Sequence, residues 1–238
     1  FDFSPHSLAP TPGLALFMRA DRNGDGRLTP EELTAFYKQC DRDDQGFLSL
    51  MDVQEAFRPG KPLKGSSGGP DGPKRNTLIR GLFRQEIGSL QSGPALGASA
   101  TDFTLKTVDG SKELTLSKLI GPRPVVLIFG NVTCGPLRSH GGNIEKLLRR
   151  YGDRATFAMV YVREAHPTDG WAMESNDRVG VTLEQPRDYA GRVKSAELCT
   201  SRLKLGIPVL VDTIDDAVGA RYSGMPGRFY LIDGNGKI

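Results

Sequence analysis

The sequence predicts two domains of different class, a small all-α module followed by a larger α/β domain. Three observations predict this division. Residues 14–58 hold two loops rich in Asp and Gly between apolar segments with helical spacing. Residues 59–95 are rich in Gly, Pro, Ser and Lys and offer little that could be buried, which is typical of a linker. From residue 96 to residue 238, strand-like apolar runs alternate with helical patterns, as in an α/β sandwich.

The elements of the α/β domain are predicted from the pattern of apolar residues along the sequence. Residues 102–119 predict a hairpin or short strands around the Asp109-Gly110 pair. Continuous apolar runs predict buried central strands at 124–130, 156–162 and 207–213. Helical patterns occupy 143–152 and 187–203, and a short helix at 77–87 interrupts the linker. The last segment, 228–238, predicts a strand, an Asn-Gly turn and the start of another strand.

Composition excludes some classes of function. The 238 residues carry a net charge of only +3 with Lys and Arg scattered among acids, so we expect no nucleic-acid partner. No apolar run approaches the roughly 20 residues that cross a bilayer. The three cysteines are too few and too widely spaced for a disulfide framework. The sequence reads as a fragment from Phe1 to Ile238, so the compartment is unknown.

The first Asp/Gly-rich loop, residues 21–32, matches the calcium loop of the EF-hand position by position, with Gly26 at the sharp turn. Its oxygen donors suit a hard cation such as calcium. The predicted ligands are Asp21, Asn23, Asp25, the backbone carbonyl of Arg27, Thr29 and Glu32.

The second loop, residues 41–52, repeats the scheme but ends in Asp where Glu is preferred. The predicted ligands are Asp41, Asp43, Gln45, the backbone carbonyl of Phe47, Ser49 and Asp52. Because the Asp side chain reaches less far, we expect weaker or magnesium-tolerant binding here. The alternative for both loops is a plain surface turn. One helix, Pro30 to Cys40, must leave the first loop and enter the second.

Cys134 is the candidate reactive thiol. It lies four residues after Gly130, which ends the first buried strand, and just before a helix. A helix N-terminus at that place is expected to lower the pKa of the thiol toward the reactive thiolate. Pro136 suits the first helical turn and the Thr133 hydroxyl can donate a hydrogen bond. Position 137 is Leu, so the CxxC chemistry of thioredoxins is excluded.

Three motifs carry a resemblance to a known family: FGNVTCGP around Cys134, YVREAHPTDGWAM after the second strand, and VLVDTIDDAVGARYSGMPGRFYLID near the end. Residues 96–238 resemble the catalytic domain of iodothyronine deiodinases, which are related to peroxiredoxins and have a thioredoxin-like fold. The resemblance implies that Cys134 is the nucleophile in the place of selenocysteine. It further implies that Glu164 and His166 deliver a proton, that Tyr161 lies in the same pocket, and that Arg228 faces the substrate or the thiolate.

The sequence departs from the animal enzymes of that family at particular positions. Val132 stands where they often carry an auxiliary cysteine, Gly135 replaces the first of two prolines, and Pro186 falls where they have a histidine thought to grip the hormone phenol. Because a thiolate is a poorer nucleophile toward iodine than a selenolate, the resemblance implies a slower enzyme.

The residues themselves support part of this assignment. His166 follows a buried strand at the edge where a neighbouring strand presents Cys134, so it could protonate a leaving group near neutral pH. Glu164 could hold the tautomer of His166, although a capped strand end would show the same residues. Met225-Pro226 lies where thioredoxin folds place a cis-proline, which would bring Arg228 near the sulfur.

The remaining candidates have weaker signals. Trp171 either lines the pocket or caps the core. Cys199, on a helix, is interpreted as an inert buried thiol rather than a partner that resolves an oxidised Cys134. Cys40, at a helix end beside a calcium loop, is interpreted as structural.

The first hypothesis is a thiol-dependent oxidoreductase that deiodinates an iodinated aromatic with Cys134, needs an external thiol reductant and no organic cofactor, and binds calcium in its EF-hands. One alternative is a peroxiredoxin-like thiol peroxidase, in which Arg228 or Arg138 assists the attack of Cys134 on peroxide. Another is a calcium-regulated binding module without catalysis. Whether two copies of the chain pair as a homodimer stays open.

Overall fold

The computed structural model describes residues 12–57, 75–83 and 91–238. Its N-terminal part is a small helical module made of α1 (Pro12–Ala20), α2 (Pro30–Cys40) and α3 (Leu50–Ala56). The two predicted loops lie between these helices, and α2 is the single helix that joins them, as expected. The buried core of the module is small, and its members are Ala20, Phe36, Cys40 and Ala56.

Capping residues fix where the module's helices begin. Thr29 caps α2 in a capping box: its hydroxyl accepts the N–H of Glu32, and the Glu32 carboxylate accepts the N–H of Thr29. Ser49 and Asp52 form the same reciprocal pair at the start of α3. Both helices therefore begin inside the acidic loops, and the last acid of each loop serves as a cap.

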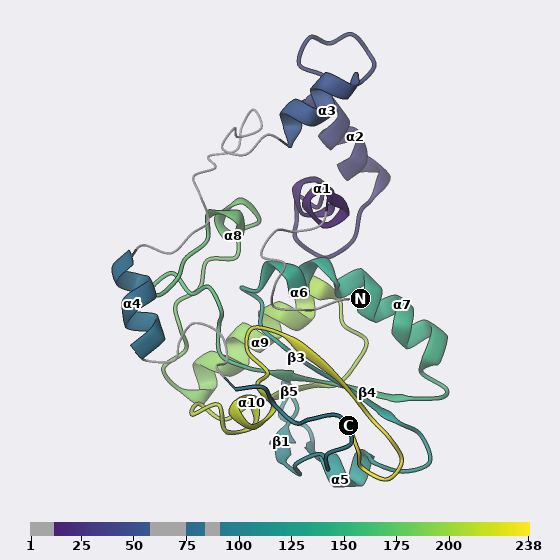
Figure 1. Cartoon of the computed structure of the whole chain (residues 1–238), viewed down its shortest axis with the longest axis vertical. Helices are drawn as coiled ribbons and strands as arrows, with labels where there is room; N and C mark the ends of the chain where they lie inside the picture. Colours follow the sequence, from purple (N-terminus) through teal and green to yellow (C-terminus); the bar gives the residue numbers. More distant parts are fainter. Residues whose placement is uncertain (1–11, 58–74, 84–90) are drawn as a thin grey trace.

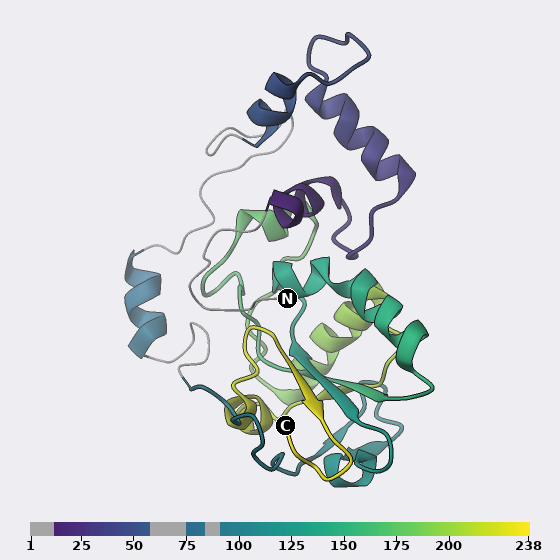
Figure 2. The same cartoon turned by 45° about the vertical axis from the view of Figure 1, so that its right-hand side comes forward.

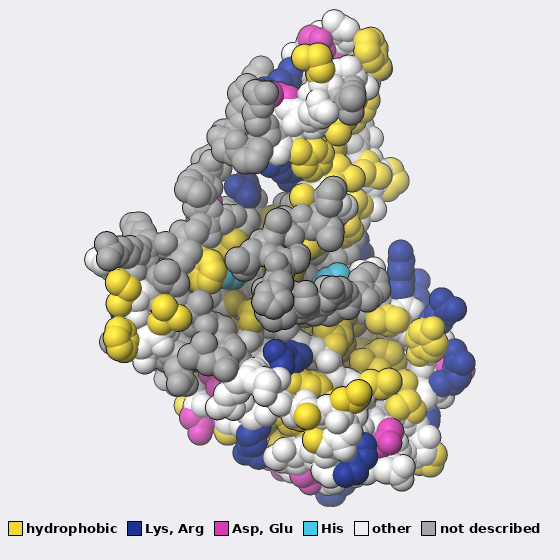
Figure 3. Space-filling view, in the orientation of Figure 1, with side chains coloured by type: hydrophobic (Ala, Val, Ile, Leu, Met, Phe, Trp, Pro, Cys, Tyr) yellow, Lys and Arg dark blue, Asp and Glu magenta, His cyan; other side chains and the backbone are white. Residues whose placement is uncertain are grey.

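The predicted linker holds α4 (Arg75–Phe83), which confirms the expectation of a short helix there. Its apolar residues Ile79, Leu82 and Phe83 are exposed among the described residues. Figure 3 shows hydrophobic side chains over α4, at the left of the molecule. The rest of the predicted linker, apart from 91–95, lies outside the described residues.

The α/β domain is built on a four-stranded sheet of β3 (Val125–Gly130), β4 (Thr156–Tyr161), β5 (Val209–Val211) and β6 (Arg228–Ile232). The strand order is β5-β4-β3-β6, in which β3, β4 and β5 are parallel and β6 is antiparallel to β3. β3 is central and almost wholly buried, as its continuous apolar run predicts. This order, with a cis peptide bond at Met225-Pro226 before β6, is that of a thioredoxin-like fold.

A separate hairpin of β1 (Thr104–Lys106) and β2 (Glu113–Thr115) confirms the prediction around Asp109-Gly110. It meets the sheet through a bridge between Thr107 and Leu210, and α5 (Leu116–Leu119) follows it. At the C-terminal end, the strand expected after the Asn-Gly turn is reduced to a bridge between Lys237 and Ser99.

Helices cover both faces of the sheet. α6 (Gly135–Ser139) and α7 (Gly141–Tyr151) connect β3 to β4, and α9 (Tyr189–Leu203) connects β4 to β5. Since both right-handed crossovers step in the same direction, α7 and α9 cover the same face, which is the face toward α1 in Figures 1 and 2.

Two further short helices had no clear signal in the sequence, α8 (Glu174–Arg178) and α10 (Ala217–Tyr222). Each has six residues or fewer, so neither shows a full helical period. No helix among the described residues is long and apolar enough to span a bilayer.

Candidate active site

The thiol of Cys134 lies at the carboxyl end of the central strand. β3 ends at Gly130, a turn of three residues follows, and Cys134 is the N-cap of α6. Pro136 falls in the first turn of α6, as predicted. Gly130 is required for close packing, since a Cβ there would lie 2.3 Å from a methyl carbon of Leu137. The predicted order of strand, active turn and helix is confirmed.

The Cys134 thiol is buried, with 5% of the residue exposed. Burial raises the pKa of this thiol, and the N–H of Leu137 and the charge of Arg138 offset only part of that rise. The first turn of α6 therefore lowers the pKa as expected, but burial outweighs it, so the expected net fall in the pKa of Cys134 is wrong. α6 has only five residues, so its field is weak, whereas removal of water from the thiolate acts at full strength.

The guanidinium that influences the thiol belongs to Arg138. Its side chain is buried and donates to the carbonyl oxygen of Val132 and, at 2.6 Å, to Oδ1 of Asn176. Asn176 in turn donates to the carbonyl oxygen of Thr133 at 2.9 Å. Arg138 and Asn176 thus hold the backbone of the turn that carries Cys134.

Arg228 does not take the expected place beside the sulfur. Its Nη1 donates to the carbonyl oxygen of Ser92 at 2.6 Å, so the side chain is held by the segment that precedes β1. The electrostatic influence on the thiol comes from Arg138 instead. The residue that comes close to the sulfur is Gly227, where an added Cβ would lie 4.0 Å from Sγ of Cys134.

A buried acidic cluster adjoins the thiol. The hydroxyl of Thr133 donates to Oε2 of Glu164 at 2.7 Å, and the N–H of Thr133 donates to the same oxygen at 3.1 Å. The hydroxyl of Tyr161 donates to Oε1 of Glu164 and accepts the N–H of Val132 at 3.2 Å. Burial raises the pKa of Glu164, although these donors stabilise its charged form. The predicted residues Thr133, Tyr161 and Glu164 are therefore brought together.

His166 lies at the same edge of the sheet, but its imidazole does not bond to the Glu164 carboxylate as expected. Its backbone N–H donates to the Thr133 hydroxyl at 3.1 Å, and its Nδ1 lies 3.2 Å from the carbonyl oxygen of Trp171. A carbonyl oxygen can only accept, so this contact places a proton on Nδ1. The carbonyl of Trp171, not Glu164, sets the tautomer. The Trp171 ring stands edge-on to the imidazole, with centroids 4.8 Å apart.

The other two cysteines fit the inert interpretation. Cys199 has no exposed surface, and burial strongly raises the pKa of its thiol. Cys40 is buried in the core of the helical module. None of the three cysteines forms a disulfide in the structure.

The α/β domain is similar to known proteins. A family model described as iodothyronine deiodinase matches residues 79–238. The chain belongs to the iodothyronine deiodinase family. It is 29% identical over 149 residues to type I iodothyronine deiodinase of Xenopus laevis, and the match covers 63% of this chain and 57% of that protein. It is 31% identical over 138 residues to thyroxine 5-deiodinase of Gallus gallus, which covers 58% of this chain and 52% of that protein.

The chain spans little more than half the length of these curated relatives. A family model described as EF hand matches residues 14–37, which include the first acidic loop. Among solved structures, the thioredoxin domain of a thiol-disulfide oxidoreductase from Bacteroides vulgatus is similar at 18% identity and a TM-score of 0.44, and covers 61% of this chain and 86% of that one.

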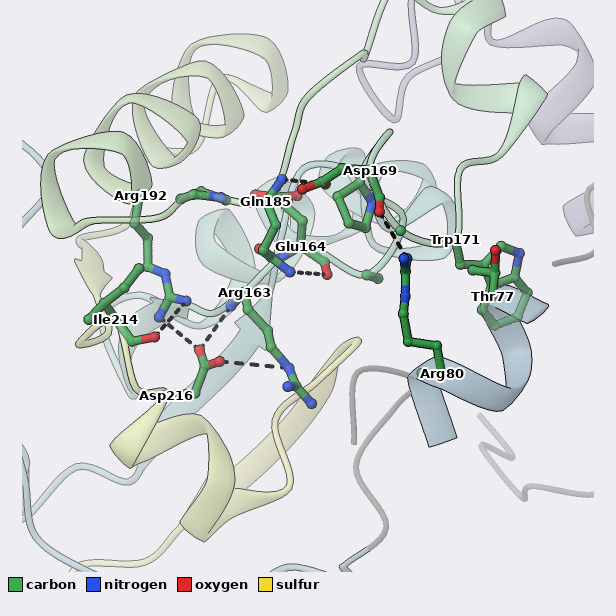
Figure 4. Close-up of a pocket in the computed structure, with 15 residues that line it drawn as sticks. Thr77, Arg80, Arg163, Glu164, Asp169, Trp171, Gln185, Arg192, Ile214 and Asp216 are labelled. Carbon is green, nitrogen blue, oxygen red and sulfur yellow. Dashed lines mark hydrogen bonds and ion pairs between the residues drawn. The ribbon is translucent and has the colours of Figure 1, made fainter. Parts of the chain in front are cut away.

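A cavity of about 450 Å³ lies beside the site of this deiodinase-family chain. Figure 4 shows its walls: Trp171 and α4 on one side, Ile214 and Asp216 on the other. Glu164 joins the cavity to the thiol site, because its backbone is held by both ends of the Gln185 amide, at 2.9 Å and 3.2 Å. Trp171 therefore lines the pocket, which settles the choice left open by the sequence.

The two acidic loops keep the turn of a calcium loop. In each, the first Asp accepts the N–H groups of the fifth and sixth residues, and the glycine at the turn has a positive φ. In the first loop three carboxylates are buried, those of Asp21, Asp25 and Glu32. Among the residues that the structure describes, no three acidic, His or Cys side chains converge on one point.

Glu32 explains why the carboxylates stay apart. Its oxygens accept the N–H groups of Arg22 and Thr29, both at 3.1 Å. The loop as a whole offers carboxylate, amide, hydroxyl and carbonyl oxygens, which are the ligands that calcium takes. The donor set of the first loop therefore fits calcium. The second loop is less complete: Asp43, Gln45 and Phe47 are exposed, and Asp52 is bound to Ser49.

Several residues that organise the site were not singled out in the sequence. Asn131 is buried directly after β3: its Oδ1 accepts the N–H of Ala165 and its Nδ2 donates to the carbonyl oxygen of Pro226, both at 3.2 Å. It thereby joins the loop after β4 to the cis-proline turn. A polar amide after a fully apolar strand was a usable signal. The sequence carried no such signal for Asn176 and Arg192, because their helices bring them to the site from far along the chain.

Proposed function

We propose that this chain reduces the carbon–iodine bond of an iodinated aromatic, with Cys134 as the nucleophile and an external thiol as the reductant. The observation that carries the proposal is the position of Cys134. It follows the central strand of a deiodinase-family domain and adjoins the cluster of Thr133, Glu164 and Tyr161. Such a thiol, placed beside groups that can carry protons, suits nucleophilic attack on iodine.

The reaction is balanced with two thiols. The sulfur of Cys134 takes the iodine, the aryl carbon keeps the bonding electron pair and takes a proton, and a sulfenyl iodide remains on the protein. An external thiol attacks that sulfur, releases iodide and forms a mixed disulfide. A second thiol then releases the Cys134 thiol and leaves an external disulfide. In sum, one aryl iodide and two thiols give one arene, one disulfide and hydrogen iodide.

We assign the proton transfer to His166. The place of His166 at the thiol site, where its backbone N–H donates to the Thr133 hydroxyl at 3.1 Å, supports this assignment. Glu164 is positioned to stabilise positive charge on this side of the site and to fix the turn through Thr133. Because the resting thiol is buried with a raised pKa, Cys134 is mostly protonated at neutral pH, and its proton must leave before attack.

The cavity beside Glu164 is our proposed site for the aromatic ring. Trp171, Pro186 and Ile214 give it apolar walls, and the rest of the lining is largely charged or polar, with Arg80, Arg163, Glu164, Asp169, Gln185, Arg192 and Asp216. Trp171→Ala should therefore raise KM for an iodinated phenol by about tenfold, the loss of about 1.4 kcal/mol of ring contact. A change confined to kcat would contradict the cavity as the ring's binding site.

We also propose that the first acidic loop binds calcium through Asp21, Asn23, Asp25, Arg27, Thr29 and Glu32. When bound, the ion would supply a fixed charge that draws these oxygens together. The EF-hand match at residues 14–37 and the loop's backbone turn support this proposal. Binding at the second loop is proposed as weaker, because Asp52 is shorter and bound to Ser49.

The test of function uses the whole chain with dithiothreitol and an iodinated phenol, and follows iodide release. The proposal expects release that is abolished in Cys134→Ser and kept in the matched variant Cys199→Ala. Iodide release that survives in Cys134→Ser would overturn it.

A peroxidase remains the second candidate because of one observation, the charge of Arg138 beside the thiol. In peroxidases of this type an arginine assists attack on peroxide and the thiol becomes a sulfenic acid. Consumption of hydrogen peroxide with dithiothreitol, without iodide release, would favour it. Activity in neither assay would favour a binding module.

A further inference from the structure

The first acidic loop is packed against the backbone that follows Cys134. The carbonyl oxygen of Gly26 accepts the N–H of Gly142, at the start of α7, at 3.0 Å. The two segments touch through glycines. A Cβ at Gly26 would lie 2.0 Å from the carbonyl oxygen of Arg138, and a Cβ at Gly142 would lie 2.5 Å from the carbonyl oxygen of Gly26. No larger residue would allow this approach.

Arginines fasten the contact from both sides. Nη1 of Arg27 donates to the carbonyl oxygen of Leu203 at 3.0 Å, at the end of α9. In the opposite direction, Nη1 of Arg202 donates to the carbonyl oxygen of Asn23 at 2.7 Å and to that of Val179 at 2.6 Å. The ends of α8 and α9 and the first loop are thereby joined in one polar network.

The contact continues into the thiol site through Arg138. Its backbone meets Gly26, while its side chain holds Val132 and Asn176, which holds Thr133. Thr133 adjoins Cys134 in the sequence, and one residue separates Val132 from Cys134. Buried groups, rather than solvent, therefore connect the first acidic loop to the thiol.

The second loop has no comparable arrangement. Figures 1 and 2 agree that α1 and the first loop lie over α6 and α7, whereas α3 and the second loop point away from the α/β domain. Residues 42–47 of the second loop are exposed. The two loops thus differ in position, and the second serves as an internal control.

We infer that the first loop is a positioning element of the thiol site: calcium in this loop, and not in the second, fixes the α6–α7 junction and sets how readily Cys134 is reached. This inference rests on the calcium site proposed above. An ion that draws in Glu32 stiffens the backbone from Asp21 to Glu32, and the junction packed on Gly26 then opens less often. Since the thiol is buried, reagents reach it only in such openings.

The experiment measures two quantities on the whole chain with calcium or with chelator: the rate of Cys134 alkylation by iodoacetamide at fixed pH, read by peptide mass, and amide exchange over residues 131–142. Calcium binding is measured separately by calorimetry. We expect calcium to slow alkylation by at least about fivefold, the lower end of ordinary coupling between sites, with slower exchange in that segment.

Three variants make the test specific. Glu32→Gln keeps a side chain that can complete the capping box but loses the ligand charge, so it should abolish the calcium effect. Asp52→Asn, its counterpart in the second loop, should leave the effect intact. Arg202→Met should still bind calcium yet lose part of the effect on alkylation, because its bond to Asn23 is gone while the contact between Gly26 and Gly142 remains.

The outcomes separate this inference from the proposed calcium site and from the proposed chemistry. Calcium binding that depends on Glu32 but leaves alkylation and exchange unchanged would overturn the inference and leave the ion site standing. An absence of calcium binding at the first loop would overturn both. Neither result depends on iodide release, so the deiodination proposal is tested independently.

Discussion

Replacing Thr133 with Val probes the buried cluster most directly. The Thr133 hydroxyl is fully buried, donates to Oε2 of Glu164 at 2.7 Å and accepts the N–H of His166 at 3.1 Å. Valine has nearly the same shape and can make neither bond. The hydroxyl also lies 3.0 Å from Oδ1 of Asn131, so the substitution removes three polar contacts while it leaves the packing of the turn almost unchanged.

The structure sets the magnitude. A hydrogen bond to a charged group contributes about 1.5–3 kcal/mol, and a stranded N–H such as that of His166 adds about 1–3 kcal/mol. Glu164 keeps the donors Tyr161 and the Thr133 N–H, so the lower end applies. We expect the free energy of unfolding to fall by about 3 kcal/mol.

Urea unfolding followed by tryptophan fluorescence is the assay, because the chain has one tryptophan, Trp171, whose ring stands against His166. Thr133→Ser is the control: it keeps the hydroxyl and loses a methyl group, worth about 1 kcal/mol. If the Val variant loses no more stability than the Ser variant, the hydroxyl is not what holds the cluster and the reasoning fails.

Three further predictions follow from the buried charges. The alkylation rate of Cys134 should still rise with pH above 9, because burial raises the pKa of the thiol from its ordinary 9.0; a plateau below pH 9 would contradict this. Glu164→Gln should flatten the pH dependence of stability, since a carboxyl whose pKa is raised by burial contributes stability that is present below about pH 4.3 and lost as pH rises through the folded pKa. Urea midpoints from pH 4 to 7 measure it, and parallel curves for both proteins would refute it. Arg192→Met should cost about 1–3 kcal/mol, because Asp216 loses its 2.8 Å partner but keeps Arg163, whose Nε lies 3.7 Å from the same carboxylate. The double variant with Asp216→Asn should recover part of that loss, and no recovery would show that packing, not charge, is at stake.

Much of the fold was readable because its signals are local. The apolar run of β3, the loop template at residues 21–32 and the Asp109-Gly110 turn each depend on neighbours in the sequence, and each was confirmed. The short helices α8 and α10 gave no periodic signal and were missed. The domain boundaries stay predictions, since most of the linker lies outside the described residues.

By itself the sequence determined which residues could carry the chemistry: a single cysteine after a central strand, the Glu164 and His166 pair after the next strand, and one complete calcium loop. Only the tertiary structure decided how they are used. Burial, a property of the whole packed domain, raises the pKa of Cys134 against the local field of its helix. The local path of the backbone gave His166 the Trp171 carbonyl and put Arg138 rather than Arg228 beside the thiol, whereas contacts between distant segments packed the first loop against α7. Spacing along a chain specifies residue types, but solvent exclusion and partner choice depend on which distant segments fold against one another.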